Sequence, residues 1–363
     1  MTTSQGYFIR PAQMSDLDGL YTLSILTGTG FTSLQPDRDF LTRMLVKSTA
    51  AFRDPDPMGS QSFLLIMEAL ETGQVVGCAS VKTGVGDDSF MCADFELIGR
   101  EGLPVSSEED FISLRMARTL TGLTEVGSLF LHPEHRASGA GRFLARSRYM
   151  LMATRPDVFC HPIVAQLRGV CDSEGNSPFY DAVWAERLGA SYDRTDRLLA
   201  RHGAGYLLDG FEGLDVSLGD LQPQARETIG QPHPTSAGAL RLLMQEGFSP
   251  STLIDLSDGG PIVMAETAQL TCMQAALPVE ATASGLSGTE DTAMLVMPEF
   301  PDFCAYVGPV SAPSTDLVAC PELFLNTLRE RDFQADNLLL STSSALTFRS
   351  ANKHTAAGTQ LHA

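Results

Sequence analysis

Residues 129–142 read LFLHPEHRASGAGR, and this stretch decides the expected fold. A short apolar run is followed by Arg136, Gly139 and Gly141, and then by residues with the apolar spacing of an amphipathic helix. Glycines in such a turn leave backbone N–H groups open at the helix N-terminus, where the helix dipole favours an anion. The stretch therefore predicts a strand, a turn that holds a pyrophosphate, and a helix.

Two familiar nucleotide motifs do not fit this turn. A Walker A loop requires Gly-Lys-Ser/Thr after the glycines, and no such sequence follows. A dinucleotide-binding fold requires an acidic residue about 20 positions further on, and none stands at that distance. An ordinary glycine-rich turn without a ligand remains the alternative.

The rest of the chain has an α/β pattern. A strand-like run near the N-terminus precedes helical spacing that begins at Ser15 and Asp16. Residues 84–120 are polar and show no clear pattern. The other expected elements are a hairpin formed by 63–67 and 75–81, strands at 125–131 and 161–170, helices at 141–155, 177–190 and 234–248, a strand–turn–strand unit at 251–266, and a small sheet with one helix at 290–349.

Composition excludes several classes of function. The net charge of −19 and the pI near 4.7 exclude nucleic acid and anionic membranes as partners, because both would be repelled. The sequence contains no apolar stretch long enough to span a membrane and no signal peptide, so a cytoplasmic protein is expected. Seven scattered cysteines form no C-x-x-C pair, which argues against a disulfide framework and against a metal site.

The turn resembles the coenzyme A signature Q/R-x-x-G-x-G/A of the GNAT family of N-acetyltransferases. This resemblance implies an α/β (α+β) fold with a mixed, mainly antiparallel sheet, helices on both faces, and a second, partly GNAT-like C-terminal part. It also implies that the strand before the turn pairs with the pantetheine arm of coenzyme A, which acts as a co-substrate and is not permanently bound. The implied coenzyme-binding residues are Leu129, Phe130, Leu131, Arg136, Ala137, Ser138, Gly139, Ala140, Gly141 and Arg142.

Two further segments are similar to parts of that family. Glu125 stands four residues before Leu129, where family members carry a Glu that acts on the acceptor amine. The segment NSPFYDAVWAERLGA resembles the helix that closes the family's fold, which implies that Tyr180 protonates the departing thiolate. The segment HPTSAGALRLLMQEGF resembles that helix a second time, but the glycine turn is not repeated, so one coenzyme site is expected per chain.

Over residues 7–265 the chain resembles the arginine N-succinyltransferase family more closely. The matching segments include TGTGFTSLQPD (27–37), SLFLHPEHRASGAGRFLARSRYMLMA (128–153), VAQLRGVCDSEGNSPFYDAV (164–183) and ETIGQPHPTSAGALRLLMQEGF (227–248). The resemblance implies transfer of succinyl from succinyl-CoA to the α-amine of L-arginine, with ornithine as another acceptor in some members. It assigns the proton donor to His233 and a succinyl-CoA contact to Leu129, and it implies a homo- or hetero-oligomer.

The resemblance leaves the substrates open. Arg168 and Ser33 lie in matching segments and could hold the carboxylates of the succinyl group or the amino acid. The segments ARTLTGL (117–123) and FEGLDVS (211–217) depart from the family pattern, which weakens the identity of the acceptor. The alternatives are an N-acyltransferase for another amine and a catalytically silent coenzyme-binding relative.

We expect two domains and a tail, since 363 residues exceed the usual size of one core. Residues 1–205 would form the acyl-CoA-binding domain, and residues 206–345 would complete the active site. Residues 346–363 would form a flexible tail, because they are mostly small and polar.

Overall fold

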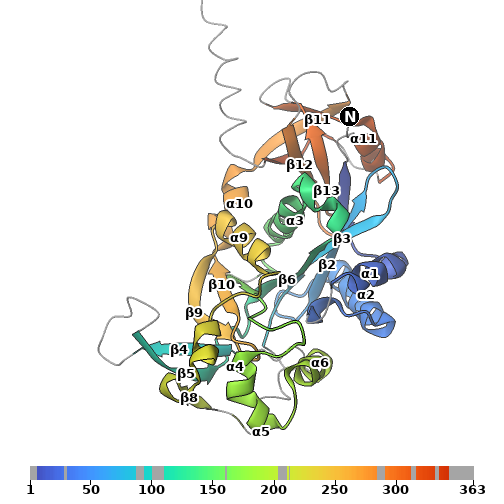
Figure 1. The fold of residues 1–363 in the computed structure, drawn as a ribbon. Coiled ribbons are helices and arrows are strands. Elements are labelled where there is room, and N and C mark those ends of the chain that lie inside the picture. Colours follow the sequence, from blue (N-terminus) through green and yellow to red (C-terminus); the bar gives the residue numbers. More distant parts are fainter. Residues whose placement is uncertain are drawn as a thin grey trace, which may run out of the picture.

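The computed structural model describes residues 6–27, 31–86, 94–99, 110–159, 162–202, 211, 213–283, 291–311, 316–331 and 335–342. These residues build one long, twisted sheet with helices packed along it (Figure 1). The expected tail at 346–363 lies outside the described residues.

The strands follow one another in the order β14-β11-β15-β12-β13-β1-β2-β3-β6-β7-β10-β9-β4-β5-β8. Two of the described pairs are parallel, β6 with β7 and β11 with β14, and the others are antiparallel. The strands are β1 (Tyr7–Pro11), β2 (Ser62–Ala69), β3 (Val75–Lys82), β4 (Asp94–Gly99), β5 (Phe111–Ala117), β6 (Thr124–Leu131), β7 (Ile163–Gln166), β8 (Asp215–Ser217), β9 (Ser249–Asp255), β10 (Pro261–Ala265), β11 (Leu277–Ala283), β12 (Asp291–Met297), β13 (Cys304–Val310), β14 (Leu317–Cys320) and β15 (Leu338–Thr342).

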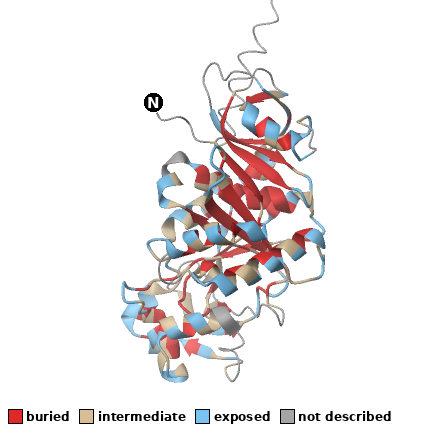
Figure 2. Ribbon diagram, turned by 90° about the vertical axis from the view of Figure 1, so that its right-hand side faces the viewer, coloured by how far each residue is buried: buried red, intermediate tan, exposed pale blue. Residues whose placement is uncertain are grey.

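Helices cover both faces of the sheet. On β2, Leu64 and Ile66 point to one face and pack against the helices α1 and α2, while Leu65 and Met67 point to the other face, where α3 packs. The strands between these layers are largely buried (Figure 2). The helices are α1 (Leu17–Ile25), α2 (Arg38–Arg53), α3 (Ala140–Thr154), α4 (Pro178–Tyr180), α5 (Glu186–Leu188), α6 (Tyr192–His202), α8 (Pro223–Thr228), α9 (Ala237–Glu246), α10 (Thr271–Ala275) and α11 (Glu322–Arg329).

The fold class predicted from the sequence is confirmed: the sheet is mixed and mainly antiparallel, with helices on both faces. The hairpin is formed by β2 and β3, and Gly73 in its turn has a φ of 67°, which a glycine adopts without strain. Helix α9 ends at Gly247, as the sequence pattern indicated, with a φ of 108°.

The expectation for residues 84–120 was wrong, because this region contributes β4 and β5. Both strands are held by pairing with distant parts of the chain: Phe95 lies opposite Ile254 of β9, and Leu114 lies opposite Val216 of β8. Phe95 is fully buried against Phe179 and Trp184. These partners are remote in sequence, so the local pattern carried little signal.

The C-terminal half joins the sheet at two places. Strands β9 and β10 extend it beyond β7, and β13 pairs with β1, so the small sheet expected at 290–349 continues the main sheet. Figure 1 shows β12 and β13 in the upper part of the molecule and β9 and β10 lower down. The domain boundary expected at residue 205 stays a prediction.

Two expectations from composition concern residues that are partly described. Cys78, Cys171, Cys272, Cys304 and Cys320 are buried free thiols. Cys92 and Cys160 lie outside the described residues. Among the described helices, none combines the length and apolar character that a membrane span requires.

Candidate active site

The candidate site begins where two parallel strands part. Thr124 and Glu125 of β6 pair with Ile163 and Val164 of β7, and the parallel ladder has no further described pair. The opposite edge of β7 is taken up by β10, so the rest of β6 has an unpaired edge on this side within the described part of the sheet. A cavity of about 1520 Å³ opens there, large enough for a coenzyme and a second small molecule.

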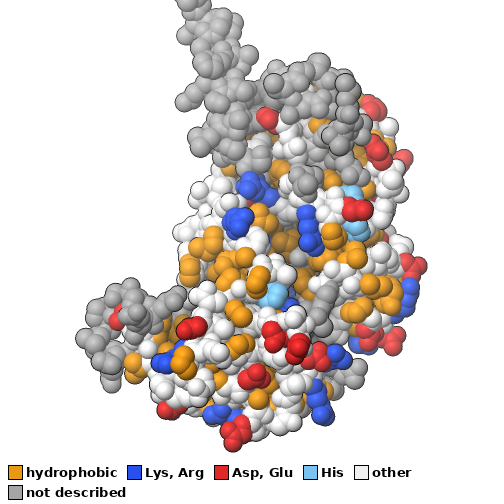
Figure 3. All heavy atoms as spheres, in the orientation of Figure 1, with side chains coloured by type: hydrophobic (Ala, Val, Ile, Leu, Met, Phe, Trp, Pro, Cys, Tyr) orange, Lys and Arg blue, Asp and Glu red, His pale blue; other side chains and the backbone are white. Residues whose placement is uncertain are grey.

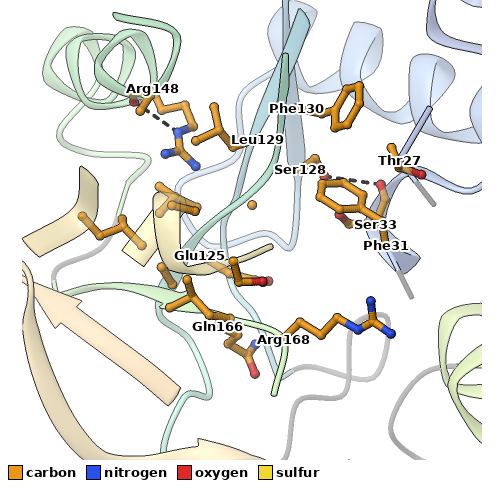
Figure 4. A pocket seen from close by; sticks show the side chains of 18 of the residues that line it. Thr27, Phe31, Ser33, Glu125, Ser128, Leu129, Phe130, Arg148, Gln166 and Arg168 are labelled. Atoms are coloured by element: carbon orange, nitrogen blue, oxygen red, sulfur yellow. Dashed lines mark hydrogen bonds between the residues drawn. The ribbon is translucent and has the colours of Figure 1, made fainter. Parts of the chain in front are cut away.

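A β-bulge at Ser128 shapes the wall of this cavity. Phe130 lies opposite Cys78 and Gly127 opposite Ser80, so β6 has one residue more than β3 between these pairs. Ser128 has a φ of 47°, and its hydroxyl donates a hydrogen bond of 3.4 Å to the carbonyl of Ser33 (Figure 4). Because of the bulge, backbone groups of β6 do not take part in the ladder with β3. They lie beside the cavity, where they could polarise the carbonyl group of a ligand.

The glycine turn forms one end of the cavity. Gly139, with a φ of 76°, is the N-cap of α3, and no described side chain caps this helix. The guanidinium of Arg136 lies over the ring of Phe130, and its Nε donates a 3.0 Å hydrogen bond to the carbonyl of Leu131. Arg142 of the first turn is bonded to Gln245 at 2.9 Å.

The structure therefore brings together most of the predicted coenzyme-binding residues. The cavity is lined by Leu129, Phe130, Leu131, Arg136, Gly139, Gly141 and Arg142. Ala140, the first residue of α3, is not among the lining residues, since it is buried in the core. Ala137 and Ser138 belong to the short 3-10 helix before Gly139, and their side chains are not described.

Glu125 lies where the parallel ladder ends. Its side chain lines the cavity, is 14% exposed, and forms an ion pair of 3.0 Å with Lys82 on β3. In Figure 4, Glu125, Gln166 and Arg168 lie on the same side of the cavity. A carboxylate at this position could accept a proton from an amine that approaches the bulge.

His233 lies at the rim. Its backbone N–H donates a 2.8 Å hydrogen bond to the carbonyl of Arg168, which lines the cavity, but His233 itself is not among the lining residues described. Its Nδ1 accepts the backbone N–H of Thr235 at 3.2 Å, so the neutral ring carries its proton on Nε2. Burial and the charge of Arg168 lower the pKa of His233, which favours the neutral ring.

The structure does not bring Tyr180 into the cavity, contrary to its expected role with the thiolate. The ring is fully buried, and the hydroxyl is bonded to Thr195 Oγ1 at 2.6 Å and to the carbonyl of Ala190 at 3.0 Å. It packs against Tyr192 in the core around α4 and α6. Tyr180 therefore belongs to the hydrophobic core, and the sequence did not show which way its side chain faces.

The sequence reasoning missed an acidic group near Arg168 in the wall of the cavity. Asp196 comes from α6, Asp255 ends β9, and Asp258 lies in the turn between β9 and β10. Asp258 is buried and accepts hydrogen bonds from the backbone of Gly169 at 2.8 Å and from the hydroxyl of Tyr192 at 3.0 Å. Helix α6 is mostly polar, so its apolar spacing gave little signal.

Charges are distributed unevenly over this face. Figure 3 shows Lys and Arg side chains over its upper part and a group of Asp and Glu side chains over its lower part, with apolar side chains between them. None of the described residues at 117–123 and 211–217 lines the cavity. The departures from the family pattern in these segments therefore lie away from its wall.

The sheet, the parting strands and the uncapped helix define the class of this protein, which is an acyltransferase. A family model described as the arginine N-succinyltransferase beta subunit matches residues 7–272. The chain belongs to this family.

Individual relatives agree with the family model. The arginine N-succinyltransferase of Enterobacter sp. (strain 638) is 31% identical over 254 residues, which are 70% of this chain and 74% of the relative. The arginine N-succinyltransferase subunit beta of Pseudomonas aeruginosa is 31% identical over 265 residues, 71% of this chain and 76% of the relative. The resemblance predicted from the sequence motifs is confirmed.

A solved structure supports the fold. The arginine/ornithine succinyltransferase subunit AI from Pseudomonas aeruginosa matches with a TM-score of 0.79 and 23% identity. The match covers 94% of this chain and 99% of that chain. It therefore extends through the C-terminal strands, beyond the residues that the family model matches.

Proposed function

We propose that this protein transfers the succinyl group of succinyl-CoA to the α-amine of L-arginine. One observation carries the proposal: a single cavity is lined by the uncapped N-terminus of α3 and also by the four carboxylates of Glu125, Asp196, Asp255 and Asp258. The first suits the pyrophosphate of a coenzyme, and the second suits a cationic amino acid. The family, whose relatives are named arginine N-succinyltransferase, supplies the particular donor and acceptor.

The residues at the parting strands divide the chemistry among them. Glu125 removes a proton from the α-ammonium group, and the free amine attacks the thioester carbon. Backbone N–H groups at the Ser128 bulge stabilise the oxyanion that forms. The carbon–sulfur bond then breaks as the protonated ring of His233 gives a proton to the thiolate of coenzyme A. The second proton that the attacking nitrogen loses on becoming an amide returns the ring to its protonated form. Arg168 and Ser33 remain the predicted contacts for a carboxylate, either that of the succinyl group or that of the amino acid.

Turnover with matched substrates tests this function. The purified protein is expected to release thiol from succinyl-CoA in the presence of arginine, and to form N²-succinylarginine as identified by mass spectrometry. Ornithine, lysine and agmatine serve as alternative acceptors, and acetyl-CoA as an alternative donor. Turnover of another amine alone would redirect the assignment, and binding of the coenzyme without any turnover would make the chain a silent relative.

The acidic group gives a prediction about pH. Burial and the neighbouring Asp255 raise the pKa of Asp196 to about 7. The carboxylate forms above this pKa while a guanidinium stays charged, so affinity for 5-guanidinopentanoate, which is arginine without its α-amine, should rise up to roughly tenfold between pH 6 and pH 8. Asp196→Asn should flatten this dependence in calorimetric titrations.

A control on the same helix separates a local effect from a general one. Asp193 forms an exposed ion pair with Arg197, and Asp193→Asn should keep the pH dependence of the wild type. An unchanged pH profile in Asp196→Asn would show that the guanidinium is held elsewhere.

We also propose a cytoplasmic oligomer. Two relatives are named as subunits, which supports assembly with further chains. The acidic net charge and the metabolic substrates are consistent with a cytoplasmic enzyme that binds neither nucleic acid nor membranes.

A further inference from the structure

The described part of the chain contains three deeply buried arginines, and one of them differs from the others. Arg10 pairs with Asp16 and Glu68, and Arg146 pairs with Glu246 at 2.6 Å. Arg148 is 2% exposed, yet no described carboxylate pairs with it. Its one described hydrogen bond, of 3.1 Å, runs from Nε to the carbonyl of Ala145 in its own helix.

The guanidinium of Arg148 belongs to the wall of the cavity. Figure 4 shows it extending from α3 toward Leu129, with its terminal nitrogens directed into the space beside β6. Tyr149 also lines the cavity, and its ring centroid lies 5.5 Å from Cζ of Arg148. The Tyr149 hydroxyl is buried and has no hydrogen-bond partner among the described residues.

A buried guanidinium with no described carboxylate beside it, next to a buried hydroxyl with no described acceptor, is costly. A buried charge without a counter-ion destabilises the folded protein, and so does a buried hydroxyl that donates to no acceptor. Burial lowers the pKa of Arg148, which reflects the same cost. An anion that enters the cavity would satisfy both groups, because a carboxylate accepts two N–H bonds from a guanidinium and a further O–H bond.

The position of Arg148 along the cavity indicates which anion. Strand β7 is parallel to β6 and follows α3, so α3 runs back along β6 from the glycine turn. Arg148 stands nine residues after Gly139, roughly 14 Å along the helix. The pantetheine arm has a backbone as long as that of four extended residues, also roughly 14 Å. A coenzyme held at Gly139 would therefore carry its acyl group beside Arg148.

We propose that Arg148, with the hydroxyl of Tyr149, forms a subsite for the free carboxylate of a dicarboxylic acyl group. The inference rests on the proposed transfer from an acyl-CoA, and it names the residues that select succinyl among acyl groups. Arg168, on the other side of the cavity, is left for the acceptor.

Butyryl-CoA provides the matched probe, since it has the length of succinyl-CoA but ends in a methyl group. We expect Arg148→Met to weaken binding of succinyl-CoA by roughly 10²–10³-fold in calorimetric titrations without acceptor. Its affinity for butyryl-CoA and for free coenzyme A should remain within about threefold, because neither ligand reaches Arg148 with a charge. Tyr149→Phe should give a smaller loss, roughly tenfold, for succinyl-CoA alone.

Arg155→Met is the control variant, since Arg155 lies just beyond the same helix, is only partly buried and pairs with Asp157. It should bind all three ligands as the wild type does. Thermal unfolding should show that Arg148→Met is folded, because it replaces an uncompensated buried cation with an apolar side chain of similar length.

Three outcomes would overturn the inference: equal losses for succinyl-CoA and butyryl-CoA, a loss for free coenzyme A, or a wild type that does not prefer succinyl-CoA. A change confined to the affinity for arginine would also contradict it, by assigning Arg148 to the acceptor. These titrations contain no acceptor. A protein that failed to turn over arginine would contradict the proposed function, but the titrations would still test the inference about Arg148.

Discussion

Replacing His233 with glutamine should lower kcat by roughly 10² to 10⁴ while the affinity for succinyl-CoA stays almost unchanged. Nδ1 is held by the backbone N–H of Thr235, which orients the ring and leaves Nε2 as the nitrogen that exchanges a proton with the thiolate. A proton transfer assists the transition state and adds nothing to ground-state binding. Steady-state thiol release and calorimetric titration of the coenzyme measure the two quantities separately.

Two further variants make this result specific. Thr235→Val removes the 2.7 Å contact between the hydroxyl and Nδ1, and should lower kcat by a smaller factor, because it releases the ring without removing it. Glu125→Gln should also lower kcat, because it removes the carboxylate that is proposed to take a proton from the amine. The remaining rate would be the rate without this base. Near-normal turnover in His233→Gln would reduce the histidine to a turn residue and make Glu125 the leading proton-transfer group.

Replacing Gly139 with valine should abolish measurable coenzyme binding, a loss of about 100-fold or more. Gly139 has a φ of 76°, which a β-branched residue adopts only with strain. The new side chain would also stand in open space at the N-terminus of α3, where the phosphates are expected to approach. Titration with succinyl-CoA and with free coenzyme A gives the readout.

Gly73→Val is the matched control for this variant. Gly73 has a φ of 67°, and a Cβ there would likewise meet no atom within 4 Å, but it lies in the turn between β2 and β3. Both variants carry similar backbone strain, and only Gly139→Val should lose the coenzyme. If Gly139→Val bound coenzyme A normally, the phosphates would have to lie elsewhere in the cavity.

Much of the site was predictable because the relevant chemistry is local. The run 129–142 contains the strand, the glycines and the start of α3 in sequence order, and the hairpin around Gly73 is equally local. Most predicted coenzyme contacts, together with Glu125, Ser33 and Arg168, line one cavity. The roles assigned to these residues and to His233 stay predictions.

The sequence did not predict which side chains are partners, because the partners come from distant parts of the chain. Asp258 accepts its hydrogen bond from a residue 89 positions away, and Arg146 meets Glu246 across 100 positions. Nothing in the run ARSRYM distinguishes Arg146, which is paired, from Arg148, which is not. The direction of Tyr180 was equally undetermined, since an amphipathic helix gives its apolar face and leaves open what that face contacts.

By itself the sequence determined the strand, turn and helix of the coenzyme end and the family of the protein, because hydrophobic periodicity and glycine conformations act within a few residues of one another. The tertiary structure alone decided that β4 and β5 exist and that Asp196, Asp255 and Asp258 meet in one wall. It also decided that no carboxylate among the described residues pairs with Arg148. These outcomes depend on which remote segments the sheet brings together, and burial then sets the cost of each polar group that finds a partner or lacks one.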